Sequence, residues 1–264
     1  MNRTNLDFTV VIPTLVTRLE NLNSLVDNFL SSEYACNIIF ICPENAISKL
    51  QFLEKKLLNQ FSVQIVAEAP GSNLPKAINQ CIPLLKTNYW NWLGDDDSLF
   101  LEEVKNIIKV LDLSEDKVIS IGSCLYRSTG SKDLFVNEVS SIKCKLIWLG
   151  PNMLSQPSIV FKTKLSRIIG GLNENYRFAF DQDFIMRNLA LGDVYLHKPI
   201  TSNYRFGLDT LTSSNRFESI YESFRIRLDL NENPIKRTFV FFTFPITASI
   251  VLLSHFLFRI RFRK

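Results

Sequence analysis

Three consecutive carboxylates, Asp95, Asp96 and Asp97, are the most chemically distinctive residues of this sequence. Neighbouring carboxylates repel one another, so an ordered cluster favours a bound cation. In extended backbone, residues i and i+2 project to the same side, which lets Asp95 and Asp97 share one face. Hard oxygen ligands suit Mg²⁺ or Mn²⁺ held jointly with substrate phosphates. The alternative is a solvated acidic turn, but the buried aromatic run YWNWL that leads into the triplet favours a metal site.

Apolar patterning predicts the scaffold that positions this triplet. Four short β-rich runs alternate with segments of helical apolar spacing in the first half of the chain. These runs cover residues 8–13, 37–42, 63–67 and 89–93. Such alternation is typical of an α/β fold with a mostly parallel sheet covered on both faces, and ligands bind at the carboxyl ends of its strands. Pro13 and Thr14, Pro43 and Glu44, and the aspartates all follow strands, so we expect them to converge on one crevice.

The second half of the chain is more mixed. We predict strands at residues 118–126, 158–162 and 193–196, and helices at residues 183–191 and 216–230. Residues 238–258 carry no formal charge and are long enough to cross a bilayer.

Composition limits the classes of function. The 264 residues are 46% hydrophobic and 21% charged, which allows a sizeable core and excludes wholesale disorder. A net charge of +4 is too small to indicate a nucleic-acid partner. The five cysteines have no CxxC spacing and are expected to be buried, reduced thiols of a cytosolic protein. The N-terminus lacks the apolar segment of a signal peptide. Because there are only two histidines, we expect any general base to be a carboxylate.

Five motifs follow one another along residues 8–215. They are VVIPT at residues 10–14 with Arg18 after it, GSNLPKAINQCI at 71–82, WLGDDDSL at 92–99, IIGGLNENYRFAFDQDFIMRNLALG at 168–192, and NYRFG at 203–207. As an ordered set they resemble the family 2 glycosyltransferases, which have the GT-A fold. The resemblance implies a donor-binding half at residues 1–98 and an acceptor and catalytic-base half at 99–215. Beyond it, we expect C-terminal helices with a membrane anchor at 216–264.

This resemblance also implies roles for individual residues. Asp95, Asp96 and Asp97 would hold Mn²⁺ or Mg²⁺ together with the donor. Asp181 matches the catalytic base of an inverting transfer, in which the acceptor hydroxyl is deprotonated opposite the leaving diphosphate. Asp183 would bind the acceptor or orient Asp181, whereas capping of the following helix is the alternative role for Asp181.

The donor-binding set is completed by residues that follow strands or lie on the helix near residue 76. It comprises Pro13, Thr14, Arg18, Glu44, Lys76 and Asn79, with Asp95 and Asp96. Arg18 and Lys76 are candidate contacts for the diphosphate, with a solvated helix face as the alternative for each. Asn152 and Gln156 are candidates for the acceptor pocket, as is Trp148, for which core packing is the alternative.

The chain departs from the family pattern at three places. ICPENAIS replaces an acidic stretch after the second strand, so Glu44 would have to bind the nucleobase or ribose. Phe180 stands where a Glu often precedes the base. Gly207 stands where a His is common, and Asp209 is a possible substitute on the metal side.

We therefore expect a metal-dependent inverting glycosyltransferase. The default donor is a UDP-hexose, and the default acceptor is a lipid-linked saccharide of O-antigen or capsule synthesis. The alternatives are a sugar nucleotidyltransferase, which would normally carry a Gly-rich loop after its first strand, and a membrane-tethered sugar-nucleotide-binding protein without activity.

The apolar tail predicts attachment to the cytoplasmic face of the inner membrane through residues 236–264. Lys236 and Arg237 precede the tail, and a basic cluster at residues 259–264 follows it. A single span would place that cluster outside, against the positive-inside tendency. Pro245 permits a bend. We expect a bent, interfacial or re-entrant anchor, with a true span and a helix packed on the soluble domain or in an oligomer interface as the alternatives.

Overall fold

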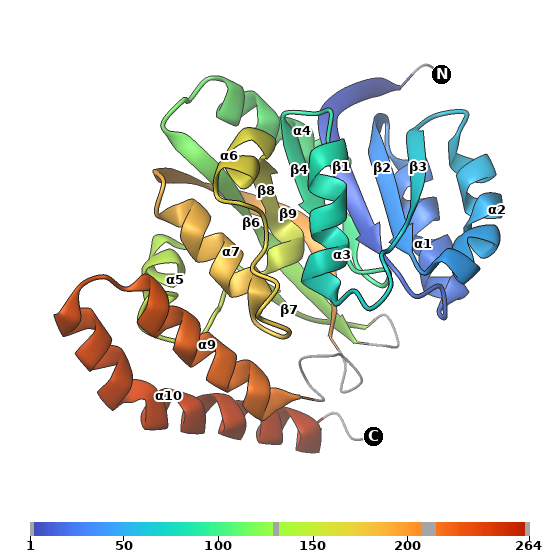
Figure 1. The fold of residues 1–264 in the computed structure, drawn as a ribbon. Helices are drawn as coiled ribbons and strands as arrows, with labels where there is room; N and C mark the ends of the chain where they lie inside the picture. The colour runs from blue at the N-terminus through green and yellow to red at the C-terminus, as the bar shows by residue number, and fades with distance from the viewer. Residues whose placement is uncertain (1–2, 129–131, 207–214, 262–264) are drawn as a thin grey trace.

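The computed structural model describes residues 3–128, 132–206 and 215–261. In this part of the chain the strands form one nine-stranded sheet in the order β3-β2-β1-β4-β8-β6-β9-β5, with β7 paired to β6 (Figure 1). The strands are β1 (Thr4–Pro13), β2 (Tyr34–Cys42), β3 (Ser62–Ala67), β4 (Tyr89–Trp92), β5 (Ser98–Leu99), β6 (Lys117–Ser128), β7 (Asp133–Asn137), β8 (Ile159–Lys162) and β9 (Asp193–Phe206).

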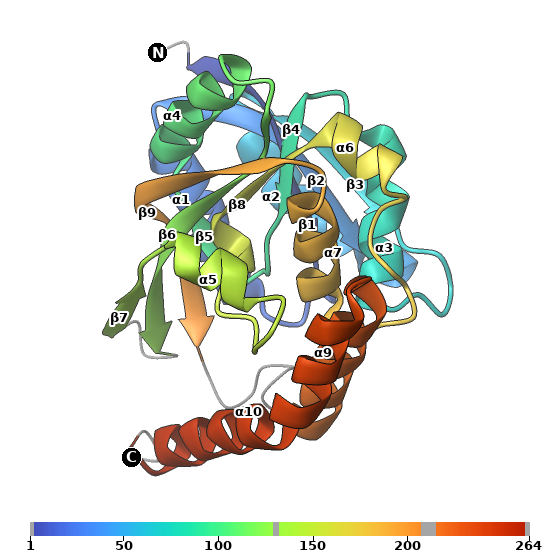
Figure 2. The ribbon, with the colours of Figure 1, turned by 90° about the vertical axis from the view of Figure 1, so that its left-hand side faces the viewer.

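Helices lie on both faces of this sheet, which confirms the predicted α/β class (Figures 1 and 2). Helices α1, α2 and α4 bury their apolar residues in the core of one face, and α3 and α7 bury theirs in the core of the other. The helices are α1 (Leu19–Ser31), α2 (Ile47–Leu57), α3 (Leu74–Cys81), α4 (Leu101–Asp112), α5 (Ser141–Leu146), α6 (Thr163–Ile168), α7 (Phe180–Leu189), α9 (Arg216–Leu230) and α10 (Pro234–Arg261).

The first four strands pair in parallel, as predicted. Successive residues of β1 enter opposite cores: Val10 and Ile12 pack on one face, and Val11 packs on the other. This period of two explains why the strands read as continuous apolar runs, because a sheet covered on both faces buries both sides of each strand. The five cysteines are all free and buried, as predicted.

The second half of the sheet is mixed, with β8 antiparallel to both β4 and β6. The strand predicted at residues 193–196 is longer in the structure, where β9 runs from Asp193 to Phe206 and includes the NYRF segment. Its pairing with β6 shifts register between His197 and Ile200. Pro199 lies in this irregularity, where the missing backbone N–H breaks no ladder hydrogen bond.

Helix α7 begins at Phe180, three residues before the predicted start at Asp183. The cause is a carboxylate from a distant helix. Glu222 of α9 accepts hydrogen bonds from the backbone N–H groups of Arg177, Phe178 and Ala179, at 2.9, 2.7 and 2.9 Å. These bonds satisfy amides ahead of the helix that no local side chain caps. Asp181 therefore lies in the first turn of α7.

The C-terminal helices α9 and α10 lie side by side (Figure 2), and α9 also packs on α7, where Ile226 enters the core of the sheet domain. Helix α9 matches the predicted residues 216–230, and α10 is one helix that extends the predicted apolar segment at both ends. It contains Pro245 and bends partway along its length (Figure 1). Val240 is fully buried, and Phe244 stacks on Phe224 of α9 with ring centroids 4.1 Å apart.

The outward side of α10 is apolar and exposed. Residues Pro234–Ser254 have a mean hydropathy of 1.6, and α10 is the one helix in the described part of the chain that is long and apolar enough to cross a membrane. Its exposed large side chains include Phe242, Ile246 and Ile250, which are 72, 63 and 60% accessible. Their i, i+4, i+8 spacing places them along one stripe.

Candidate active site

Thr14 joins the ends of β1 and β4. Its hydroxyl donates to Oδ2 of Asp95 at 2.8 Å and accepts the backbone N–H of Val16 at 3.0 Å. Val16 has a φ of +56°, a strained conformation for a β-branched residue. Strain of this kind persists only where neighbouring contacts enforce it, and here the Thr14 hydroxyl and the burial of the Val16 side chain do so. The loop after β1 is thus held against the aspartates.

Arg18 binds two of the three aspartates. Its guanidinium donates to Asp95 Oδ1 at 2.6 Å and to Asp96 Oδ2 at 2.7 Å. The side chain of Arg18 is half-exposed. The carboxylates that the sequence assigns to a metal are therefore paired with a cation from the protein itself.

Asp97 is different, because it is buried and accepts a hydrogen bond from the backbone N–H of Arg205 at 3.0 Å. Burial raises its pKa well above the usual range, and the charge of Asp96 raises it further. In the described residues, no group of three or more His, Cys, Asp or Glu side chains forms a ready metal site. Burial destabilises the charged form of Asp97, and two further carboxylates lie next to it in the chain. This arrangement fits a cation that arrives with a diphosphate, since Mg²⁺-type sites use one or two carboxylates plus phosphates.

Asp181 is positioned by an aromatic cluster that links α7 to β4. Trp92, three residues before Asp95, stacks on Phe161 at 5.4 Å and contacts Phe180 and Phe184 at 6.2 and 5.7 Å between ring centroids. These two phenylalanines flank Asp181 on α7. The strand that carries the aspartates and the helix that carries the candidate base are thereby packed through shared rings.

Burial raises the pKa of Asp181 from 3.8 to about 6, and the charge of Glu222 adds to the shift. The backbone N–H of Gln182 donates to its Oδ1 at 2.8 Å, which opposes the shift. A carboxylate with a pKa near 6 is charged at neutral pH but basic enough to accept a proton in a transition state.

Asp183, two residues further along, has a different environment. It is 2% exposed, and its Oδ2 accepts two hydrogen bonds from Arg187 at 2.8 and 2.5 Å. Arg187 in turn donates to the carbonyls of Ile169 and Gly171, both at 2.8 Å. The contacts of Asp183 therefore hold a loop to α7.

Asn79 holds the same loop from the other side. Its amide donates to the carbonyl of Leu172 and to Glu174, both at 2.9 Å, and accepts the N–H of Leu172 at 2.8 Å. Gly171 has a φ of +75°, and a Cβ there would lie 2.6 Å from Asn79 Oδ1, so this position requires glycine. Asn79, predicted to bind the donor, has its amide committed to the loop.

The remaining predicted donor residues lie at the end of a strand or just after one, or at the start of α3. Pro13 ends β1, and Glu44 is exposed at the start of a 3₁₀ turn (Glu44–Ala46) directly after β2. Lys76 is exposed in the first turn of α3, where Asn73 caps its backbone N–H. Gly207 and Asp209 lie outside the described residues.

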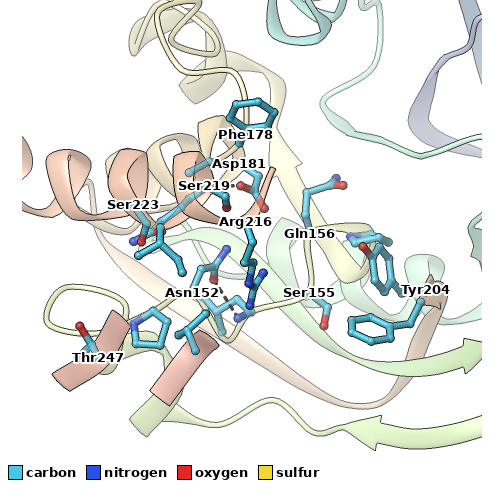
Figure 3. A pocket seen from close by; sticks show the side chains of 18 of the residues that line it. Asn152, Ser155, Gln156, Phe178, Asp181, Tyr204, Arg216, Ser219, Ser223 and Thr247 are labelled. Carbon is cyan, nitrogen blue, oxygen red and sulfur yellow. Dashed lines mark hydrogen bonds between the residues drawn. The ribbon is translucent and has the colours of Figure 1, made fainter. Parts of the chain in front are cut away.

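A cavity of about 340 Å³ is lined by both Asp97 and Asp181. Figure 3 shows Asp181 among the residues that line it. Asn152 and Gln156, the candidates for the acceptor pocket, line this cavity, whereas Trp148 packs against the core. Tyr126, Tyr204 and Phe206 form an aromatic wall, with Tyr126 and Tyr204 5.0 Å apart between ring centroids.

Sequence patterns do not reveal several residues of this cavity. Arg216, Ser219 and Ser223 reach it from α9, and Thr247, Ala248 and Val251 reach it from α10. For the α10 residues, the sequence offers one signal, the apolar run at residues 238–258. This run predicts a long helix but does not indicate which surface the helix packs against. The tail is therefore part of the cavity wall as well as an apolar surface.

Comparisons with known proteins agree with this arrangement at the level of the fold. No family model matches the sequence, and neither does any curated protein. Among solved structures, the chain resembles residues 1–349 of Staphylococcus aureus TarS in complex with UDP-GlcNAc, with a TM-score of 0.61, 14% identity, and coverage of 89% of this chain and 70% of that one. Of a longer TarS chain it covers 39%.

A second similar structure is the mannosyltransferase PcManGT from Pyrobaculum calidifontis in complex with GDP-Man and Mn²⁺. Its TM-score is 0.64 at 13% identity, and the match covers 94% of this chain and 74% of that one. At these identities the likeness concerns the fold. The chain has the α/β architecture of the GT-A-type glycosyltransferases that bind nucleotide sugars.

Proposed function

We propose that this protein is a metal-dependent, inverting family 2 glycosyltransferase. It transfers a sugar, by default a hexose from UDP, to a lipid-linked saccharide of surface-polysaccharide synthesis. The observation that carries the proposal is the cavity that places Asp97 of the aspartate triplet and Asp181 on shared walls. An inverting displacement needs the leaving group and the base on opposite sides of the transferred sugar. In this proposal the cavity meets that need, with the leaving diphosphate toward Asp97 and the acceptor hydroxyl toward Asp181.

The chain's own residues account for the chemical requirements. Asp181, with its pKa raised to about 6, takes the proton of the acceptor hydroxyl as that oxygen attacks the anomeric carbon. The bond from the anomeric carbon to the diphosphate breaks, and the configuration inverts. A divalent cation held by Asp97 with Asp95 and Asp96 would neutralise the charge of the leaving diphosphate. Thr14, Arg18, Glu44 and Lys76 form the donor side.

In this proposal Asp183 and Asn79 are positioning residues. Both bind the loop that contains Ile169, Gly171 and Leu172, and this loop precedes α7. By holding the loop they hold the helix that presents Asp181, without contacting the substrate.

The aromatic wall and α10 support a saccharide acceptor at a membrane. Flat aromatic faces beside polar groups such as Asn152 and Gln156 suit the alternating apolar and hydroxyl surfaces of a sugar. Because α10 lines the cavity on one side and exposes Phe242, Ile246 and Ile250 on the other, we propose that it lies in the interface of the cytoplasmic leaflet.

The test is a donor screen with the full chain in nanodiscs. UDP-, GDP- and dTDP-sugars are supplied with Mn²⁺, and release of the nucleoside diphosphate is measured. We expect the wild type to release the nucleoside diphosphate from one class of donor. When an acceptor is added, we expect Asp181→Asn to lose transfer of the sugar to it. Asp27→Asn, an exposed change on α1, is the matched control.

No nucleoside diphosphate from any donor, with no donor binding by calorimetry, would refute the proposal. Release of inorganic pyrophosphate from a nucleoside triphosphate and a sugar phosphate would instead identify a nucleotidyltransferase. Donor binding without turnover, with or without Mn²⁺, would identify a binding protein.

A further inference from the structure

Arg216, the first residue of α9, lines the same cavity as Asp181 (Figure 3). Its Nε is buried and has no hydrogen-bond partner in the described part of the chain. No ion pair joins it to a carboxylate among those same residues. Burial lowers the pKa of this arginine. A buried N–H of a charged guanidinium that has no acceptor is costly, and an anion would supply one.

The other arginines around the site have partners. Arg227 lines the same cavity but donates to the carbonyls of Ser223 and Leu149 at 3.0 and 3.1 Å. Arg18 binds Asp95 and Asp96, and Arg205 donates to Asn21 at 2.7 Å. Arg216 is therefore the basic side chain best placed to bind an anionic ligand inside the cavity.

The position of Arg216 indicates which substrate carries that anion. Asp97 is the member of the aspartate triplet that lines the cavity, whereas the candidate donor residues Asp95, Asp96, Thr14 and Arg18 are not among its lining residues. The cavity thus belongs to the acceptor side. Its far wall is Thr247, Ala248 and Val251 of α10, the helix whose outer stripe is exposed and apolar. An anion at Arg216 would lie between the candidate base and a helix suited to lipid.

We propose that Arg216 binds the phosphate group that joins the acceptor saccharide to its lipid. The proposal rests on the glycosyltransferase function proposed above and names the acceptor class, a lipid diphosphate. The planar guanidinium matches two phosphate oxygens at once, and the hydroxyls of Ser219 and Ser223 on the same cavity wall add donors. The sugar next to the phosphate then lies toward Asp181, and the lipid lies along α10.

The experiment titrates the full chain in nanodiscs with a short-chain prenyl diphosphate, the prenyl alcohol of equal length, and inorganic pyrophosphate. EDTA is present, so that a metal on the aspartates cannot recruit the diphosphate. The variants are Arg216→Ala and Arg216→Lys, with Arg225→Ala as the matched control because Arg225 is an exposed arginine of the same helix. Thermal unfolding confirms that each variant is folded.

We expect Arg216→Ala to weaken prenyl diphosphate binding roughly tenfold to a hundredfold, the range for a lost charge-assisted hydrogen bond. Arg216→Lys should retain part of the affinity, Arg225→Ala should retain all of it, and the alcohol should show no dependence on Arg216. Unchanged affinity in Arg216→Ala, or no binding by the wild type, would overturn the proposal. Equal, Arg216-dependent binding of inorganic pyrophosphate would overturn the assignment to a lipid.

A parallel titration with nucleoside diphosphates and Mn²⁺ separates the two substrates. If Arg216→Ala weakens nucleotide binding and leaves prenyl diphosphate binding unchanged, the arginine serves the donor and the proposal fails. If prenyl diphosphate binding depends on Arg216 but no nucleotide sugar is turned over or bound, the phosphate site stands and the proposed function fails.

Discussion

Replacing Asp181 with Asn should make the protein more stable and inactive in transfer. Burial raises the pKa of this carboxyl from 3.8 to about 6. At about 1.4 kcal/mol for each pKa unit, the charged form costs the folded state about 3 kcal/mol at pH 7. Because part of the side chain faces the cavity, solvent screens some of this cost, and we expect a gain of about 1–3 kcal/mol in the free energy of unfolding. The Asn oxygen can still accept the N–H of Gln182.

The dependence on pH fixes the sign of this effect. The folded-state pKa lies above the unfolded value, so the penalty is fully present above pH 6. It fades as the pH falls through 6 toward 3.8, because the folded protein takes up the proton first. The advantage of Asp181→Asn should therefore shrink between pH 7 and pH 4. Transfer by the wild type should fall as the pH drops below about 6, since a protonated base cannot act.

Urea unfolding of the full chain in EDTA, at pH 7 and pH 4.5, measures the stability difference, and acceptor transfer at pH 7 measures activity. Asp183→Asn is the matched control, two residues away on the same helix. It should lower stability, by roughly 1–2 kcal/mol, because Arg187 keeps its charge and loses its charged partner. A destabilised Asp181→Asn with normal transfer, or a stable but inactive Asp183→Asn, would refute this assignment of the two carboxylates.

Three further predictions concern other parts of the site. Glu222→Gln should lower stability by roughly 1–3 kcal/mol, because three amides before α7 lose a charged acceptor. It should also shift the acidic limb of the pH–rate profile to lower pH, because the charge of Glu222 raises the pKa of Asp181. Urea unfolding and rates from pH 5 to 8 check both effects, and an unmoved acidic limb would contradict the second. Asp97→Asn should abolish transfer while leaving the fold intact, and EDTA should stop the wild type; sustained turnover in EDTA would exclude the metal. The triple change Phe242→Glu, Ile246→Glu and Ile250→Glu should release the protein from anionic liposomes in a flotation assay without unfolding it. By contrast, Val240→Glu should disrupt the packing of α10 on α9. If the triple variant still floats with the liposomes as the wild type does, the interfacial anchor is ruled out.

Much of the donor half could be predicted from sequence because its signals are local. A strand covered on both faces reads as an apolar run, and parallel strands end at one edge, so the meeting of Thr14 with Asp95 followed from pattern alone. The aromatic character of YWNW also indicated a buried strand, which the stacking of Trp92 explains. The α/β class and the long apolar C-terminal helix were predictable for the same reason.

The roles of individual polar side chains were decided by the tertiary structure. Asp181 and Asp183 are the same residue type two positions apart, but one lines a cavity and the other pairs with Arg187. The start of α7 depends on Glu222, and the cavity wall depends on how α10 docks against α9. These outcomes arise from contacts between segments far apart in the chain. Local patterns record which side chains prefer burial, whereas burial of a charge is set by whichever distant partner reaches it.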